Sequence, residues 1–155
     1  GNLSRIVGAH VLNTCAQAHN LSVKAPIKKH YQLKTNDWVI APLIKPLDRP
    51  FSLLQIKDLY KLSKLTGYGD MHAANIFNTE DGTVIIDTEE KAFTSVDIKH
   101  YHIKNFQGRI CSLSMEPEAR VWLNTKIAKL TTKQVEEETF DAIATISLLD
   151  ICAVS

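Results

Sequence analysis

Two aspartates and one asparagine have the residue types and spacing that best suit a chemical role in this chain: Asp70, Asn75 and Asp87. Asp70 follows a Gly-Tyr-Gly break at residues 67–69, which predicts a loop, and Asn75 opens a short apolar segment. Asp87 ends an apolar strand at residues 83–87, and the turn between the two segments predicts a hairpin. Since a hairpin brings the start of its first strand close to the end of its second, we expect Asn75 and Asp87 to be neighbours.

An amide oxygen and a carboxylate at one site suit Mg²⁺, a hard cation that prefers oxygen ligands and takes several of them from phosphates. Asp70, on the neighbouring loop, has the chemistry to orient or deprotonate an attacking hydroxyl. Taken singly, each residue also has an ordinary structural interpretation: Asp70 as a cap for backbone amides, Asn75 as a turn residue and Asp87 as a strand end. The joint order of Asp, His, Asn and Asp around a hairpin favours the chemical interpretation.

This arrangement resembles the catalytic loop and the metal-binding aspartate of protein kinases, where Asp-x-x-x-x-Asn precedes a hairpin that ends in apolar-apolar-Asp. The loop itself, Gly-Asp-Met-His-Ala-Ala-Asn at residues 69–75, looks more like the form found in the aminoglycoside and choline phosphotransferase branch. The resemblance implies that Asp70 is the catalytic base and that Asn75 and Asp87 are the metal ligands. It also implies a loop-shaping role for His72.

The likeness extends upstream, so that it covers about residues 3–87. The stretch His-Asn-Leu-Ser-Val-Lys at 19–24 resembles the segment after the regulatory helix of protein kinases, and residues 38–44 resemble the strand that leads into the adenine-binding hinge. The resemblance assigns four residues to the adenine site, in order from the gatekeeper through the hinge to the floor: Ala41, Leu43, Ile44 and Phe77. It therefore implies ATP and Mg²⁺ as cofactors.

Several features of the kinase family are missing from this sequence. There is no Gly-x-Gly-x-x-Gly loop, and no strand with a phosphate-binding lysine precedes the first expected helix. His10 stands where kinases place the glutamate that pairs with that lysine, and Tyr68 stands where the family usually has a histidine. Thr88 and Glu89 replace the residues that commonly follow the metal-binding aspartate, and no Ala-Pro-Glu-like motif follows. We therefore expect a chain that was cut, a naturally reduced protein, or missing parts that come from elsewhere.

Hydrophobic periodicity predicts the elements that must position these residues. Helices are expected over residues 3–18, 52–65, 116–130 and 132–153. A strand of imperfect alternation over residues 21–33 and a buried strand over 38–41, which includes Trp38, are joined by a turn and predict a second hairpin. Pro42, Pro46 and Pro50 exclude a regular helix or a central strand from the stretch that follows.

This order of helices and strands is typical of the α+β class. The resemblance refines it to a protein-kinase-like fold that is mainly C-lobe, with an N-lobe reduced to one helix and a hairpin. We expect a single domain over residues 1–155, with the residual N-lobe and hinge at 1–44 and the C-lobe with its catalytic loop at 45–155.

Composition limits the class of partner and compartment. The 155 residues are 45% hydrophobic and carry a net charge of +1, which argues against a nucleic-acid or membrane-surface binder. No apolar run approaches the roughly 20 residues that a membrane-spanning helix needs. Three widely spaced cysteines, Cys15, Cys111 and Cys152, predict buried thiols without disulfides in a reducing, cytoplasmic compartment. Secretion as a bacterial effector is an open alternative.

Three interpretations of function follow. The first is an ATP- and Mg²⁺-dependent phosphotransferase that acts on a hydroxyl of a protein or a small molecule. The second is a pseudokinase or interaction module that keeps the fold without phosphoryl transfer, as the missing phosphate-binding elements suggest. The joint presence of Asp70, Asn75 and Asp87 favours the first, and a protein partner that supplies a lysine and a glycine loop would connect the two. The third is a small α+β domain with an accidental motif match.

Overall fold

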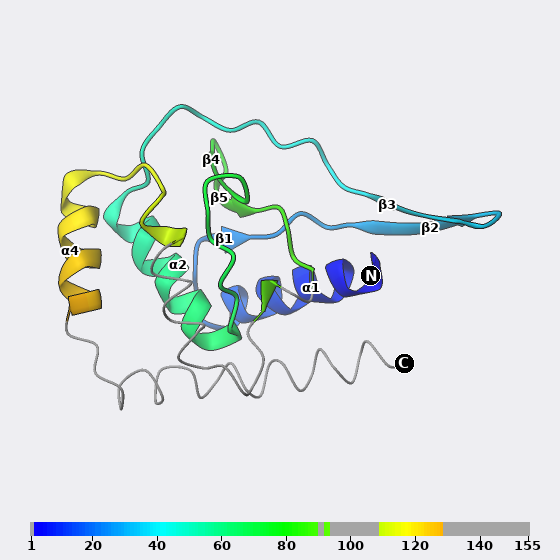
Figure 1. Ribbon diagram of the computed structural model, residues 1–155, viewed down its shortest axis with the longest axis horizontal. Helices are drawn as coiled ribbons and strands as arrows, with labels where there is room; N and C mark the ends of the chain where they lie inside the picture. The colour runs from blue at the N-terminus through cyan, green and yellow to red at the C-terminus, as the bar shows by residue number, and fades with distance from the viewer. Residues whose placement is uncertain (1, 90–91, 94–108, 129–155) are drawn as a thin grey trace.

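The computed structural model describes residues 2–89, 92–93 and 109–128 of the chain. Within these residues the fold is α+β, with three helices, a mixed three-stranded sheet and a separate two-stranded hairpin (Figure 1). The helices are α1 (Asn2–Ala18), α2 (Leu53–Thr66) and α4 (Pro117–Ala128). The strands are β1 (Val23–Lys24), β2 (Lys29–Leu33), β3 (Asn36–Ile40), β4 (Ile76–Thr79) and β5 (Gly82–Ile85). The α+β expectation is confirmed, and the helix expected at 132–153 lies outside the described residues.

Helix α2 has a defined start and a defined stop. The Ser52 hydroxyl accepts the backbone N–H of Gln55 at 3.2 Å, and the Gln55 side chain accepts the N–H of Ser52 at 2.9 Å, so the two residues form a capping box. At the other end Gly67 has a φ of 77°, a left-handed conformation in which glycine carries no Cβ penalty, and its N–H bonds to Ser63. This stop turns the chain into the loop that carries Asp70.

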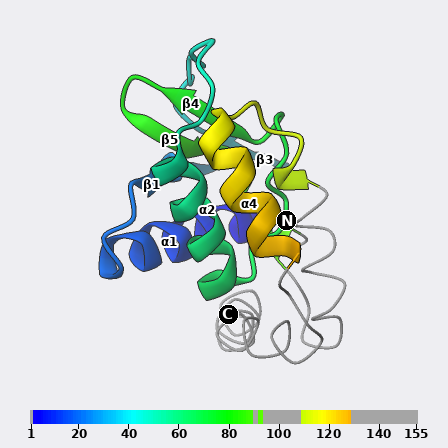
Figure 2. The ribbon, with the colours of Figure 1, turned by 90° about the vertical axis from the view of Figure 1, so that its left-hand side faces the viewer.

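The three helices enclose the core. Figure 2 shows α2 and α4 side by side, with α1 crossing α2. Leu59 and Leu62 of α2 and Leu123 of α4 are fully buried, and each such side chain contributes roughly 1.5–3 kcal/mol of hydrophobic stabilisation. The rings of Tyr60 and Trp122 meet edge to face with centroids 5.5 Å apart, which adds a specific contact between α2 and α4.

The mixed sheet joins the N-terminal part of the chain to the hairpin of β4 and β5. The hairpin pairs Ile76 with Ile85 and confirms the turn expected near residues 80–82. Strand β1 lies parallel to β5, on the side away from β4, and pairs Val23 with Thr83. The side chain of Gln55 also donates to both Asn78 and Thr83, at 3.0 Å each, so the start of α2 is tied to the hairpin.

A single strand over residues 21–33 was a wrong prediction. The chain leaves the first sheet after β1 and enters the second hairpin only at β2. Between them, the Asn13 side chain both donates to the Ala25 carbonyl and accepts its N–H, at 2.9 Å each. Pro26 has no N–H to offer a strand partner. Through Asn13, helix α1 therefore makes the two backbone hydrogen bonds with Ala25 that a neighbouring strand would otherwise make.

The prediction of a buried strand over 38–41 was also wrong. Strands β2 and β3 do form the expected hairpin, with Tyr31 opposite Trp38. However, this hairpin projects from the body of the molecule (Figure 1). Trp38 is 54% exposed and Ile40 is exposed too, because none of the described residues forms a third strand or a covering layer on that face.

Two further expectations concern the whole chain. No helix in the described ranges is long and apolar enough to cross a membrane. Cys15 and Cys111 form no disulfide among the described residues, as expected, but they are partly buried and not fully buried as predicted. Cys152 lies outside the described residues.

Candidate functional site

The loop between α2 and β4 closes on itself through Asp70 and Asn75. The side-chain amide of Asn75 donates to the Asp70 carboxylate, with Nδ2 2.7 Å from Oδ2, and to the Asp70 backbone carbonyl at 3.1 Å. Asn75 is buried and Asp70 is partly buried. The same Nδ2 also lies 3.2 Å from Nε2 of His72. Because this nitrogen is directed at Asp70 and His72, the Asn75 side chain fixes the direction of the Asp70 carboxylate and turns its own Oδ1 away from Asp70.

The β4–β5 hairpin brings Asp87 beside Asn75. The N–H of Ile86 donates to the Asn75 carbonyl at 2.9 Å, which continues the hairpin ladder by one step beyond the named strands. Asp87 follows directly, and its Oδ1 accepts the N–H of Glu89 at 3.3 Å. The structure thus collects the three sequence-predicted chemical residues, Asp70, Asn75 and Asp87, at one end of the hairpin.

The hydroxyl of Tyr68 contacts the backbones of both aspartates, Asp70 and Asp87. Its hydroxyl donates to the Asp87 backbone carbonyl at 2.5 Å and lies 3.5 Å from the backbone carbonyl of Asp70. The ring is fully buried and meets Phe93 edge to face at 5.4 Å between centroids. Burial raises the pKa of the Tyr68 phenol, and the negative charges of Asp70 and Asp87 raise it further, so the hydroxyl keeps its proton as a donor.

His72 shapes the Asp70 loop. Its Nδ1 accepts the N–H of Ala74 at 3.2 Å, and its Nε2 lies 3.2 Å from Nδ2 of Asn75. That Nε2 faces Asp70 at 3.4 Å from Oδ1. These contacts support the loop-shaping role inferred for His72.

Arg109 completes the surroundings of Asp70. Its Nη1 forms an ion pair with Asp70 Oδ1, from a position 39 residues further along the chain. Sequence reasoning missed Arg109, since no local motif surrounds it and the preceding stretch reads as polar and irregular. Its place at the site is a property of the tertiary fold.

Lys28 was also missed as a site residue, and it lies beside Asp87. Its Nζ donates to the Ile86 carbonyl at 3.0 Å and to the Thr88 hydroxyl at 2.7 Å. Thr88 in turn donates to the Arg5 carbonyl of α1 at 2.6 Å. Burial lowers the pKa of the Lys28 ammonium, and the negative charge of Asp87 opposes that shift. Lys28 therefore links α1, the segment after β1 and the residues that flank Asp87.

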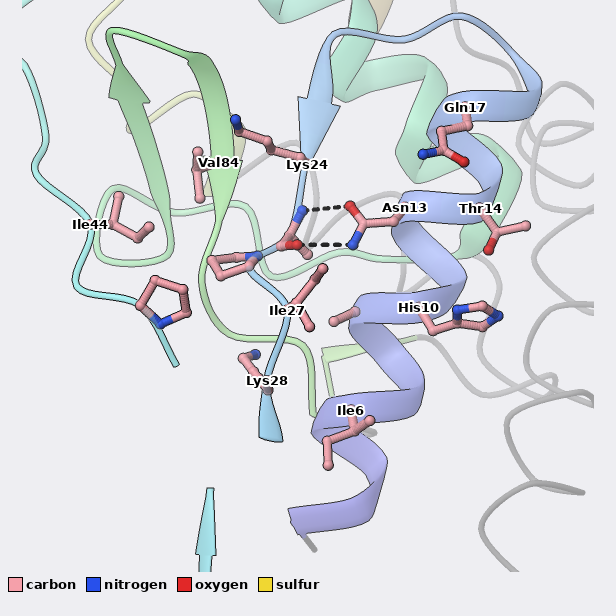
Figure 3. A pocket seen from close by; sticks show the side chains of 14 residues that line it. Ile6, His10, Asn13, Thr14, Gln17, Lys24, Ile27, Lys28, Ile44 and Val84 are labelled. Carbon is pink, nitrogen blue, oxygen red and sulfur yellow. Dashed lines mark hydrogen bonds between the residues drawn. The ribbon is translucent and has the colours of Figure 1, made fainter. Parts of the chain in front are cut away.

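A cavity of about 710 Å³ lies between α1 and residues 42–44, with Lys28 between them (Figure 3). Its size is in the range of small-molecule sites, roughly 300–1,000 Å³. Its other lining residues come from α1, from 24–27 and from β5.

Of the four residues assigned to the adenine site, Ile44 lines this cavity, whereas Ala41, Leu43 and Phe77 are not among its described lining residues. Leu43 is 88% exposed, and Ala41 is exposed. Phe77 is half-buried on β4, opposite Val84. The structure therefore gathers the three residues predicted for catalysis and metal binding but brings only Ile44 of the predicted adenine set to the cavity.

The oxygen atoms of Asn75 and Asp87 suit an open Mg²⁺ site with few protein ligands better than a closed site in which protein side chains supply every ligand. Asn75 offers its amide oxygen, and Asp87 offers a carboxylate whose one described hydrogen bond is the 3.3 Å contact from Glu89. Among the described residues no three His, Cys, Asp or Glu side chains cluster as a closed metal site would require. In phosphotransferase sites, Mg²⁺ typically binds one or two protein oxygens, and phosphates and water supply its remaining ligands.

Comparison of the chain with protein-family models, with curated proteins and with solved structures found no match. The resemblance to kinases therefore rests on the sequence motif, and the kinase-like fold stays a prediction.

Proposed function

We propose that this chain is an ATP- and Mg²⁺-dependent phosphotransferase with a reduced protein-kinase-like fold, which transfers phosphate to a hydroxyl of a protein or a small molecule. The observation that carries this proposal is the convergence of Asp70, Asn75 and Asp87 at one end of a hairpin. A buried Tyr68 hydroxyl between the backbones of the two aspartates holds them in register. Catalysis in this class depends mainly on positioning and charge neutralisation, which a small rigid site can provide.

The proposed chemistry assigns each residue one role. Asp70 accepts the proton of the acceptor hydroxyl as its oxygen forms a bond to the terminal phosphorus of ATP. The bond from that phosphorus to the bridging oxygen breaks, and ADP leaves with the electron pair. Asn75 and Asp87 would hold Mg²⁺, which neutralises charge on the phosphates when bound.

The cavity provides room for the nucleoside of ATP. It is bordered by Ile44 on one side and by Lys28 on the other. Lys28 lines the cavity and also donates to the Ile86 carbonyl and the Thr88 hydroxyl, on either side of Asp87. Asp70, Asn75 and Asp87 are not among the described lining residues of the cavity, so the phosphates of the proposed nucleotide would have to extend beyond Lys28 to reach them.

A second candidate function is that of a pseudokinase or interaction module that binds a protein partner without phosphoryl transfer. The exposed apolar side chains of the projecting hairpin favour it: Tyr31, Leu33, Trp38 and Ile40. Exposed apolar patches of this kind often mark interaction surfaces. The two candidates differ in whether the site binds nucleotide in a magnesium-dependent way.

Thermal unfolding with and without ATP and Mg²⁺ tests the proposal, on the wild type and on Asp87→Asn. Ligand at about a hundred times its dissociation constant stabilises the folded state by roughly 2.7 kcal/mol. For a domain of this size we expect an upward shift on the order of 5–10 °C that needs Mg²⁺ and is lost in Asp87→Asn. Absence of a shift in both proteins would contradict the phosphotransferase and favour the interaction module. Asp81→Asn, on the exposed turn of the same hairpin, is the matched control and should shift like the wild type.

A further inference from the structure

Arg109 occupies the oxygen of Asp70 that the acceptor hydroxyl would need. Its Nη1 pairs with Oδ1, while the Asn75 amide takes Oδ2 at 2.7 Å. His72 Nε2 also lies 3.4 Å from Oδ1. Because Arg109 and His72 both face Oδ1, and a carboxylate oxygen accepts about two hydrogen bonds, an acceptor hydroxyl competes with Arg109 for Oδ1 and gains access when Arg109 turns to another anion.

The Arg109 backbone is held in place, whereas its side chain faces solvent. Ser112 donates to the Arg109 carbonyl both from its N–H, at 3.0 Å, and from its hydroxyl, at 2.6 Å. The neighbouring Ile110 is fully buried, but the Arg109 side chain is 43% exposed. The guanidinium can therefore turn away from Asp70 about side-chain bonds alone, without unfolding the turn that carries it.

The group that replaces Asp70 as its partner must be an anion at the point of transfer. A neutral hydroxyl cannot compete with a carboxylate for a guanidinium, whereas a phosphate offers charged oxygens, two of which can accept the two parallel N–H groups of the planar guanidinium. In the proposed reaction the terminal phosphate lies next to the acceptor hydroxyl, and therefore next to Asp70. Lys28, the cation on the Asp87 side, already donates to Ile86 and Thr88.

We propose that Arg109 binds the terminal phosphate of the nucleotide and, in moving to it, frees Asp70 to accept the proton of the acceptor. This inference rests on the proposed function. Arg109 then supplies positive charge at the transferred group, in a chain whose sequence contains no glycine-rich loop. Binding of a triphosphate and exposure of the base become one coupled event. A nucleotide that lacks the γ-phosphate, such as ADP, leaves Asp70 paired with Arg109.

Calorimetric titration with two probes tests this role: magnesium-ADP and the magnesium complex of a non-hydrolysable β,γ-imido analogue of ATP. The wild type should bind the triphosphate analogue more tightly than ADP. In Arg109→Ala the affinity for the analogue should fall by about tenfold or more, the loss expected for one charge-assisted contact, while the affinity for ADP stays unchanged. Arg109→Lys, which keeps the charge but not the planar fork, should recover part of the loss.

Matched controls separate this inference from the proposed function. Arg49→Ala removes the same charge from an exposed arginine before α2 and should bind both probes as the wild type does. If the wild type binds both nucleotides and Arg109→Ala weakens neither, or weakens both equally, the role of Arg109 is overturned while nucleotide binding stands. If the wild type binds neither nucleotide, the proposed function fails and this inference fails with it. Thermal unfolding of each variant, with the midpoint close to that of the wild type, shows that the fold is retained.

Discussion

The hydroxyl of Tyr68 donates a 2.5 Å hydrogen bond to the backbone carbonyl of Asp87, across 19 residues of sequence. The same hydroxyl lies 3.5 Å from the backbone carbonyl of Asp70. One fully buried side chain therefore sets the distance between the loop that carries the proposed base and the strand end that carries the proposed metal ligand. Tyr68 stands where the kinases that this loop resembles usually have a histidine. Its contacts with both backbones give the tyrosine a positioning role.

Tyr68→Phe should lower the free energy of unfolding by about 1–3 kcal/mol, because the Asp87 carbonyl loses its buried donor. It should also weaken binding of magnesium-ATP, because Asp87 is no longer held relative to Asp70. Urea denaturation and calorimetric titration measure the two effects. Tyr31→Phe, on the exposed face of the β2–β3 hairpin, should change the free energy of unfolding by less than about 0.5 kcal/mol. Equal effects from the two substitutions would rule out a positioning role for the Tyr68 hydroxyl.

Gly8→Ala tests the close packing of α1 against the residues after Asp87. A Cβ atom at Gly8 would clash with the backbone carbonyl oxygen of Thr88 and press on the ring of Phe93. Alanine favours a helix interior by about 1 kcal/mol over glycine, so the substitution would stabilise an isolated helix. In this protein the overpacking, typically about 1–3 kcal/mol, should outweigh that gain and lower the thermal midpoint.

The matched control for Gly8→Ala is Thr14→Ala, at an exposed position of the same helix. It should leave the midpoint unchanged or raise it slightly, because alanine has the higher helix propensity and nothing is crowded. A rise of the midpoint in both variants would show that α1 is not packed on Thr88 in solution.

Lys28 should make stability depend on alkaline pH. Because burial lowers its pKa in the folded protein below the ordinary 10.5, the unfolded chain binds this proton more tightly than the folded chain does. At a pH below the pKa of Lys28 in the folded protein, the ammonium is charged and its burial lowers the free energy of unfolding by the full amount. As the pH rises from that value toward 10.5 the cost is relieved, so the wild type should gain stability relative to Lys28→Met, and the difference should level off above 10.5.

Urea denaturation of the wild type and Lys28→Met over a series of alkaline pH values measures this difference. Lys61→Met, at an exposed position of α2, is the control, and its difference from the wild type should not follow the same course. A Lys28 difference that stays constant, or that moves in favour of the variant as the pH rises, would contradict a desolvated ammonium at this position.

Local sequence patterns predicted much of the architecture. The helices α1 and α2 start and stop within a residue of their expected bounds, because an apolar face and the Gly-Tyr-Gly break at residues 67–69 are signals contained in a few neighbouring residues. The β4–β5 hairpin follows from its turn residues in the same way. The grouping of Asp70, Asn75 and Asp87 was predictable as well, since a short loop and a short hairpin leave little freedom in how these three residues meet.

Tertiary structure decided what depends on contacts between distant segments. The parallel pairing of β1 with β5 breaks the expected strand at residues 21–33, and a two-residue strand carries no pattern that would predict its partner. The exposure of Trp38 follows from the absence of a covering layer among the described residues, whereas its apolar character alone favours burial. Arg109 reaches Asp70, and Lys28 reaches the residues that flank Asp87, only because packing of the helices and the sheet brings them there. The sequence by itself thus determined the local elements and the residues with chemical potential. The tertiary fold decided which cations lie around them, because an ion pair across 39 residues and a hydrogen bond across 58 leave no periodic signal in the chain.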